Sequence, residues 1–142
     1  IKLINSVLIL KSFDECFATI DMLVFFFFCG EGEFIKTGGV SSYILRKNAV
    51  TEICSGSLPT GIVREAKSSS YKTTLQDGDV VVILSDGVTD VSANDDWIKE
   101  TLKEKGSLSS KEIADAIMKN SCMRTEECVD DMTVIVSRIN SN

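Results

Sequence analysis

Two aspartate-containing segments carry the residues of this 142-residue sequence that are best suited to chemistry. Asp86 comes just after the hydrophobic run at 80–84, and Asp130 comes just before a second hydrophobic run at 132–136. If these runs are antiparallel neighbouring strands, the end of the first lies beside the start of the second, and the two aspartates come together. Carboxylates placed in this way suit a hard divalent cation, Mg²⁺ or Mn²⁺. Gly87 would let the backbone approach such an ion without an intervening side chain.

A purely structural interpretation of the same residues stays open. An Asp-Gly pair after a strand is commonly a turn, and an Asp-Asp pair before a strand is commonly a solvated cap. Asp77 and Asp79 illustrate this case, because they flank Gly78 in what we expect to be an ordinary hairpin turn without a function. Asp95 and Asp96 are expected to stabilise a helix N-terminus through the helix dipole.

The composition excludes several classes of function. Lys and Arg number 15 against 21 Asp and Glu, and the formal net charge is -6. With no basic run, the chain lacks the electrostatic footprint of a protein that binds nucleic acid or an anionic membrane. The sequence has no histidine, which excludes Ser-His-Asp and Cys-His catalysis. Any catalysis must therefore use carboxylates, bound water or metal, lysine, or backbone dipoles.

The five cysteines form no CxxC pair, so neither a zinc site nor a redox motif is expected. Most have apolar neighbours, which predicts reduced, mostly buried thiols and a cytoplasmic location. The sequence opens on Ile1, with its first methionine at Met22, and this suggests a piece excised from a longer protein. A membrane anchor of that protein would lie outside these residues, because the apolar run at 23–29 is too short to span a bilayer. We interpret this run as a buried strand.

The elements that position the two aspartates follow from hydrophobic periodicity and turn residues. We expect a hairpin of a β-rich segment at 16–28 and a strand at 33–36, turning at Gly30-Glu31-Gly32. The run at 80–84 is expected to be a central strand covered on both faces. The remaining expected elements are helices at 1–10, 95–105 and 111–121, strands at 43–46, 50–53, 71–75 and 132–139, and a polar loop at 122–129.

Ser85-Asp86-Gly87 and Asp130-Asp131-Met132-Thr133, each joined to a β-branched strand, resemble the two C-terminal motifs of the metal-dependent PPM (type-2C) serine/threonine protein phosphatases. Further segments narrow the resemblance to the stage II sporulation protein E subfamily and extend it over nearly the whole chain. These segments are Ala18-Thr19-Ile20-Asp21, Glu33-Phe34-Ile35-Lys36, Leu58-Pro59-Thr60-Gly61-Ile62 and Gly78-Asp79.

The resemblance implies an α+β fold, in which a β-sandwich is flanked by helices and holds a binuclear Mn²⁺ or Mg²⁺ centre. A metal-activated water would attack phosphoserine without a covalent intermediate. Asp86 and Asp130 match the C-terminal metal ligands, and Gly87, Asp131 and Thr133 are expected to support them. The implied substrate and partner is a phosphorylated anti-sigma-factor antagonist, dephosphorylated during sporulation.

The sequence departs from the family pattern in one respect, because it contains no Asp-Gly-x-Gly motif with the aspartate that bridges two metals. Residues 1–142 are therefore expected to form a single partial domain, the C-terminal part of a phosphatase domain, and to be inactive alone. The alternative is a non-catalytic interaction module that associates with a partner or a second copy, giving a homo-oligomer. Phe26, where relatives commonly have aspartate, is expected to lie in the core or in an interface.

Overall fold

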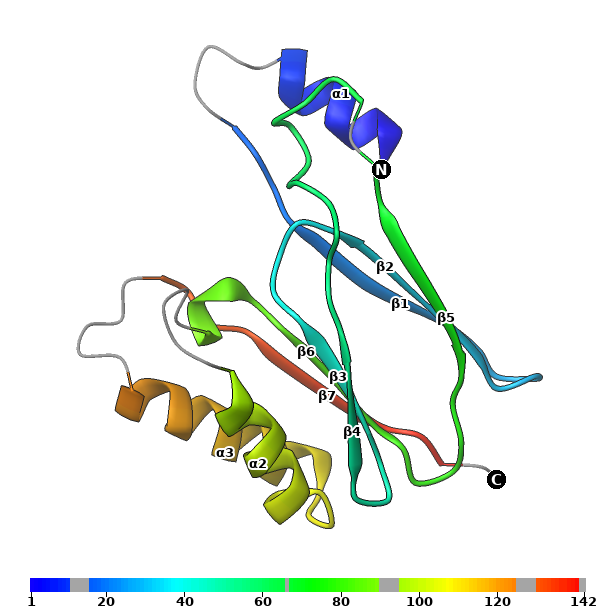
Figure 1. The fold of residues 1–142 in the computed structure, drawn as a ribbon, viewed down its shortest axis with the longest axis vertical. Helices are drawn as coiled ribbons and strands as arrows, with labels where there is room; N and C mark the ends of the chain where they lie inside the picture. Colours follow the sequence, from blue (N-terminus) through cyan, green and yellow to red (C-terminus); the bar gives the residue numbers. More distant parts are fainter. Residues whose placement is uncertain (11–15, 66, 90–94, 125–129, 141–142) are drawn as a thin grey trace. The chain divides into compact units, whose positions relative to one another are not determined.

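The computed structural model describes residues 1–10, 16–65, 67–89, 95–124 and 130–140 (Figure 1). These residues form two compact units. Unit 1 comprises Ile1–Gly39 and Cys54–Leu75, and unit 2 comprises Val40–Ile53 and Gln76–Asn142. Each unit contains one antiparallel sheet together with helical structure, which confirms the predicted α+β class. None of the helices in the described segments is long and apolar enough to cross a bilayer.

Unit 1 has a three-stranded sheet in the order β1-β2-β5 and one helix. Its elements are α1 (Lys2–Leu10), β1 (Ile20–Phe26), β2 (Glu31–Thr37) and β5 (Ser69–Thr74). Asn5 ties the helix to the loop after Thr60, because its side chain donates to the carbonyls of Val63 and Arg64 and accepts from the N–H of Gly61. Asn5 is therefore the buried residue of α1, while Leu8 and Ile9 are half-buried.

The β1–β2 hairpin is present, but its turn lies earlier than predicted. The turn occupies residues 27–30, Gly30 has a φ of 70°, and β2 begins at Glu31. The interpretation of 23–29 as a buried strand is wrong: residues 23–25 are only half-buried, and Phe27 is 84% exposed and Phe28 108% exposed. Phe26 is 51% exposed and does not belong to the core. β1 ends at Phe26, so the following aromatic side chains extend past the sheet that could have covered them.

Unit 2 has a four-stranded sheet in the order β4-β3-β6-β7. The strands are β3 (Ser42–Arg46), β4 (Ala49–Ile53), β6 (Val80–Leu84) and β7 (Val134–Arg138). β6 lies between β3 and β7, and its successive residues Val80, Val81 and Val82 are all buried. Because successive side chains point to opposite faces, the predicted central strand covered on both faces is confirmed.

Two helices and one 3₁₀ turn complete unit 2: η1 (Asp86–Val88), α2 (Asp96–Lys105) and α3 (Ser110–Arg124). The helices pack their apolar faces on the sheet, and the core cluster includes Trp97, Ile98, Leu102, Ile113 and Ile117 together with residues of β3 and β6. α3 begins with a capping box: the N–H of Glu112 donates to the hydroxyl of Ser109, and the N–H of Ser109 donates to the carboxylate of Glu112. α3 continues to Arg124, so the predicted loop at 122–129 is helical at its start; residues 125–129 lie outside the described residues.

The turn at Asp77-Gly78-Asp79 is not the predicted hairpin turn, because β5 and β6 belong to different sheets. Asp79 is 1% exposed and forms a bidentate ion pair with Arg46, with contacts of 2.9 and 2.6 Å. It also accepts the N–H of Gln76 at 2.8 Å. A local turn signal does not reveal this role, since Arg46 is distant in sequence.

The cysteines do not show the predicted burial. Cys16, Cys29, Cys54 and Cys122 are exposed thiols, and Cys128 lies outside the described residues. Apolar sequence neighbours suggested buried thiols, but three of these four cysteines lie outside helices and strands, where no regular pattern links neighbours to depth.

Candidate metal centre

The pairing of β6 with β7 brings the two aspartate segments to the same edge of the sheet. The strands are antiparallel, and Leu84 at the end of β6 pairs with Val134 at the start of β7. The segments that carry Asp86 and Asp130 leave the sheet from this pair of positions. The structure thus confirms the strand arrangement on which the predicted proximity of the two aspartates depends.

Ser85 joins the two segments by hydrogen bonds. Its N–H donates to the carbonyl of Thr133 at 3.0 Å, and its hydroxyl accepts the N–H of Thr133 at 2.8 Å. The same hydroxyl donates to the carbonyl of Asp131 at 3.3 Å. Asp131 and Thr133 therefore contribute backbone groups here. Ser85 belongs to the first of the two aspartate motifs, but the sequence predicted no role for its side chain.

Gly87 allows the two backbones to touch. A Cβ atom at this position would lie 2.5 Å from the carbonyl oxygen of Asp131 and 3.3 Å from the carbonyl carbon of Asp130. Real Cβ atoms do not approach a backbone oxygen this closely, so only glycine fits without a shift. From the sequence, Gly87 is expected to let the backbone come close to an ion. In the structure, Gly87 lies against the backbone of the other aspartate segment.

Ser121 of α3 contacts the chain next to both segments, and the sequence analysis did not predict this role. Its hydroxyl donates to the carbonyl of Val88 at 2.7 Å and lies 3.4 Å from the sulfur of Met132. The side chain is 1% exposed. Its spacing offered a signal, because Ile113, Ile117 and Ser121 recur every four residues and so share the buried face of the helix. A small hydroxyl on such a face needs a hydrogen-bond partner.

The two carboxylates are exposed and each accepts one local hydrogen bond. Asp86 Oδ1 accepts the N–H of Gly87 at 3.2 Å, and Asp130 Oδ1 accepts the N–H of Asp131 at 2.8 Å. These bonds orient each carboxyl group on its own loop. Within the described ranges, no group of three or more His, Cys, Asp or Glu side chains is placed to hold a metal ion. The described residues thus present two carboxylates on contacting loops but no cluster of three.

The acidic residues at the start of α2 form a separate cluster in unit 2. Lys99 forms ion pairs with Glu52 at 2.6 Å and with Asp96 at 3.4 Å. Burial, followed by the charge of Glu52, raises the pKa of Asp95 above its ordinary value. Asp95 and Asp96 stand at the N-terminus of α2 as predicted, although Asp95 makes no side-chain capping hydrogen bond.

Comparison with known proteins identifies relatives along the whole chain. A family model described as stage II sporulation protein E (SpoIIE) matches residues 1–140. The stage II sporulation protein E of Bacillus subtilis (strain 168) is 33% identical over 147 residues, a match that covers 100% of this chain and 18% of that protein. The protein of the same name from Priestia megaterium is also 33% identical, and the match covers 25% of its length. The chain therefore spans about a quarter or less of these relatives.

Solved structures agree with the sequence matches. The phosphatase domain of the cell fate determinant SpoIIE from Bacillus subtilis, presoaked with manganese, superposes with a TM-score of 0.78 at 32% identity, covering 100% of this chain and 66% of that one. A structure of the PP2C phosphatase domain of the same protein, with a fragment of its regulatory domain, gives a TM-score of 0.81 at 33% identity, covering 98% of this chain and 43% of that one.

Proposed function

The chain belongs to the stage II sporulation protein E family, and from this premise we propose that the protein containing it is a metal-dependent phosphoserine phosphatase. The observation that carries the proposal is the contact between the Ser85-Asp86-Gly87 segment and the Asp130-Asp131 segment. This contact holds two exposed carboxylates on adjacent loops, at the two motifs that resemble the metal-binding motifs of PPM phosphatases.

We assign Asp86 and Asp130 as ligands of Mn²⁺ or Mg²⁺. Their chemistry fits these hard cations, which prefer carboxylate and water oxygens. One relative's phosphatase domain was presoaked with manganese, which supports Mn²⁺ as the first metal to test. A bound divalent cation would polarise the phosphoryl group and lower the pKa of a coordinated water, so that hydroxide forms near neutral pH. A binuclear centre requires ligands beyond these two carboxylates.

The chain's own residues contribute position to this chemistry. Ser85 and Gly87 set the separation of the aspartate loops, and Ser121 anchors both loops to α3. Because these supports are backbone contacts and hydrogen bonds, they hold the backbone of the two aspartate loops in place before any ligand binds. Such preorganisation avoids the entropic cost of ordering the loops during the reaction.

We further propose that the substrate is a phosphorylated anti-sigma-factor antagonist and that the domain acts in the cytoplasm during sporulation. Two facts support this: relatives in Bacillus subtilis and Priestia megaterium are sporulation proteins by name, and the four described cysteines are thiols rather than disulfides, which suits a reducing compartment.

The test uses a protein that contains the whole phosphatase domain. We expect Asp86→Asn and Asp130→Asn each to reduce manganese-dependent release of phosphate from a phosphoserine protein by at least about a hundredfold, because each removes a charged metal ligand. Asp115→Asn is the matched control, since Asp115 is an exposed carboxylate on α3. Full activity in both active-site variants would reject the site assignment.

For the 142-residue chain alone we propose that metal binding is weak and phosphatase activity is absent. The described residues supply two carboxylates at this place and no cluster of three. Calorimetric titration of the chain with Mn²⁺ measures this directly. Tight, stoichiometric binding that disappears in Asp86→Asn would show that the chain needs no further ligand and would contradict this part of the proposal.

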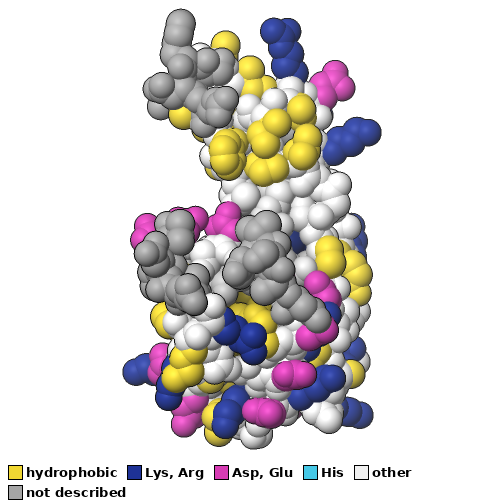
Figure 2. Space-filling model, turned by 60° about the vertical axis from the view of Figure 1, so that its left-hand side comes forward, with side chains coloured by type: hydrophobic (Ala, Val, Ile, Leu, Met, Phe, Trp, Pro, Cys, Tyr) yellow, Lys and Arg dark blue, Asp and Glu magenta, His cyan; other side chains and the backbone are white. Residues whose placement is uncertain are grey.

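Exposed apolar side chains favour a second candidate function, self-association. On α1, Leu3 is 78% exposed and Leu10 is 82% exposed, and Phe28 is fully exposed at the β1–β2 turn. Figure 2 shows hydrophobic side chains gathered on the upper part of the surface. Exposed apolar patches of this kind often mark interaction sites. Sedimentation over a wide concentration range tests this function, and a monomer at every concentration would exclude it.

A further inference from the structure

A groove runs between α2 and α3 in unit 2. It has a volume of about 330 Å³. Its lining comprises Trp97, Glu100, Thr101 and Glu104 of α2 and Asn120, Met123 and Arg124 of α3. The amide of Asn120 donates to the hydroxyl of Thr101 at 3.0 Å, and this bond closes the floor between the helices. We call it the α2–α3 groove.

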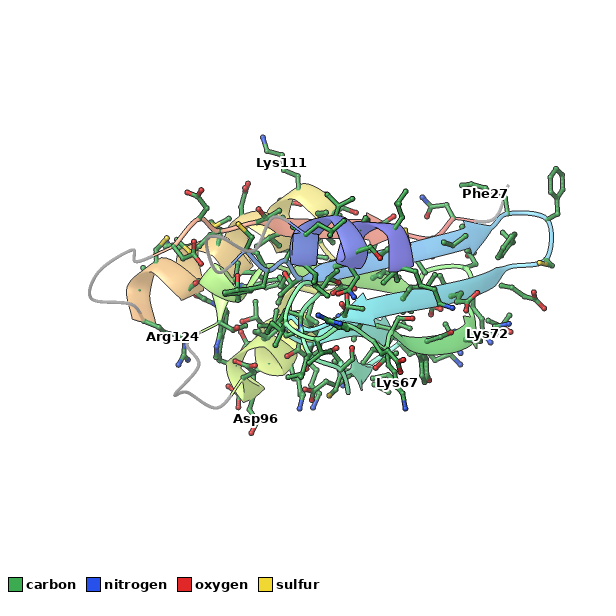
Figure 3. The ribbon with its side chains drawn as sticks, turned by 90° about the horizontal axis from the view of Figure 1, so that it is seen from above. Phe27, Lys67, Lys72, Asp96, Lys111 and Arg124 are labelled. Carbon is green, nitrogen blue, oxygen red and sulfur yellow. The ribbon has the colours of Figure 1, made fainter. Side chains whose placement is uncertain are left out.

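The indole of Trp97 contributes to the lining but is only 6% exposed, and a guanidinium group lies over its ring. The carbon Cζ of Arg124 lies 5.2 Å from the centre of the Trp97 ring. Figure 3 labels Arg124 at the end of α3, beside the start of α2, where Asp96 is labelled. A cation at this distance from an aromatic face is attracted to the ring electrons, and indole gives the strongest such interaction. The chain's own guanidinium group thus already occupies this ring.

The side of the groove formed by α2 is acidic. Glu100 and Glu104 are exposed and are separated by one helical turn, so their carboxylates are neighbours on one face. Neither carboxylate forms an ion pair within the part of the chain that the structure describes. Like charges at this spacing disfavour the helix slightly. A positive charge between them would remove this repulsion.

Met123 adds an exposed apolar surface to the same groove. Its side chain is 70% exposed, although methionine is usually buried. Methionine adapts its shape to different partners because its side chain is unbranched and polarisable. The groove therefore combines an adaptable apolar surface with two carboxylates that form no ion pair among the described residues.

We propose that the α2–α3 groove binds a basic segment of a partner protein, with an arginine or lysine side chain between Glu100 and Glu104 and an apolar side chain against Met123. Charge complementarity selects this occupant. The groove residues carry two negative charges and one positive charge, and the whole chain carries -6. These charges disfavour nucleic acid and anionic lipid. The proposal does not depend on metal binding or on phosphatase activity.

Trp97 makes the proposal directly testable, because it is the only tryptophan of the chain. The probe is a short amphipathic helical peptide with leucine on one face and arginine on the other, free of aromatic residues. Its counterpart carries glutamate in place of every arginine. We expect the arginine peptide to change Trp97 fluorescence saturably, and calorimetry to give the same affinity. The glutamate peptide should produce no saturable change.

Two groove variants should shift the affinity in opposite directions. Glu100→Gln with Glu104→Gln should weaken binding of the arginine peptide by roughly five- to tenfold, since two exposed ion pairs are lost. Arg124→Gln should strengthen binding, because it removes the chain's own competing cation. The double variant Glu31→Gln with Glu65→Gln is the matched control, since both residues are exposed in unit 1 and the same charge is removed.

The expected opposite shifts would not arise from a loss of folding, which weakens binding in every variant. Equal affinity in the groove variants and the control would overturn the proposal, as would heat of binding without a change in Trp97 fluorescence. If the groove variants alter only the chain's own sedimentation, the occupant is a second copy and the proposed partner is wrong.

Discussion

The contact at Gly87 yields the sharpest structural prediction. In Gly87→Ala the new Cβ would lie 2.5 Å from the carbonyl oxygen of Asp131, whereas contacts below 3.0 Å are essentially absent and 3.4 Å is ordinary. The carbonyl must therefore retreat by about 0.5 to 0.9 Å. The atom that must move belongs to the backbone, so a rotamer change cannot relieve the contact. Overpacking of this kind costs about 1 to 3 kcal/mol, and the expected loss of unfolding free energy lies in this range.

Urea unfolding of the 142-residue chain measures this loss. Gly56→Ala is the matched control, since its new Cβ would meet only Ser69 Oγ, at 3.5 Å, and we expect little change or slight stabilisation. In the whole phosphatase domain, a carbonyl shift beside Asp130 should also lower activity by on the order of a hundredfold, because the site tolerates little misplacement. If Gly87→Ala were as stable as Gly56→Ala, the two loops would not be in backbone contact and the reasoning would fail.

Three further predictions follow from hydrogen bonds and charges in unit 2. Ser85→Ala removes the hydroxyl that both accepts and donates between the aspartate segments, so we expect a loss of about 1 kcal/mol in urea unfolding and little change in Ser85→Thr. Asp95→Asn should stabilise the chain at neutral pH, because burial and the charge of Glu52 raise the pKa of Asp95 in the folded state. The protonated carboxyl of Asp95 favours folding below the ordinary pKa of 3.8, and this stabilisation is lost as the pH rises through the pKa of the folded state. Thermal melts should show the advantage of Asp95→Asn disappearing in acid, and an advantage that persists at low pH would contradict this cause. Ser109→Ala should lower the unfolding free energy by about 1 kcal/mol, because the N-cap is lost. An NMR titration should show a higher pKa of Glu112 in this variant, because the hydrogen bond from the Ser109 hydroxyl lowers that pKa in the original chain. An unchanged Glu112 titration would exclude the capping interaction.

Local sequence signals predicted the elements that hold the candidate site. The unbroken β-branched run at 80–84 indicated a strand buried on both faces, and alternation after Asp130 indicated the last strand. Antiparallel neighbours were the condition for bringing Asp86 and Asp130 together, and β6 and β7 pair in this way. The metal-binding roles of the two aspartates remain proposals.

Predictions from hydrophobicity alone overestimated how deeply several apolar side chains and cysteines are buried. Phe27 and Phe28 were expected inside a strand, and most cysteines were expected in the core, but the described members of both groups are exposed. Local composition shows that a side chain is apolar; it does not show where a strand stops. Depth depends on which other elements cover a position, and this is a property of the whole chain.

The α+β class, the main strands and helices and the two aspartate motifs could be predicted from the sequence, because hydrophobic periodicity and turn residues act over a few residues. Only the tertiary structure decided that Ser85, Gly87 and Ser121 hold the aspartate loops together, that Asp79 is buried against Arg46, and that α2 and α3 leave a groove beside Trp97. These contacts join residues distant in the chain. Their distances depend on how strands and helices pack, which no local pattern specifies.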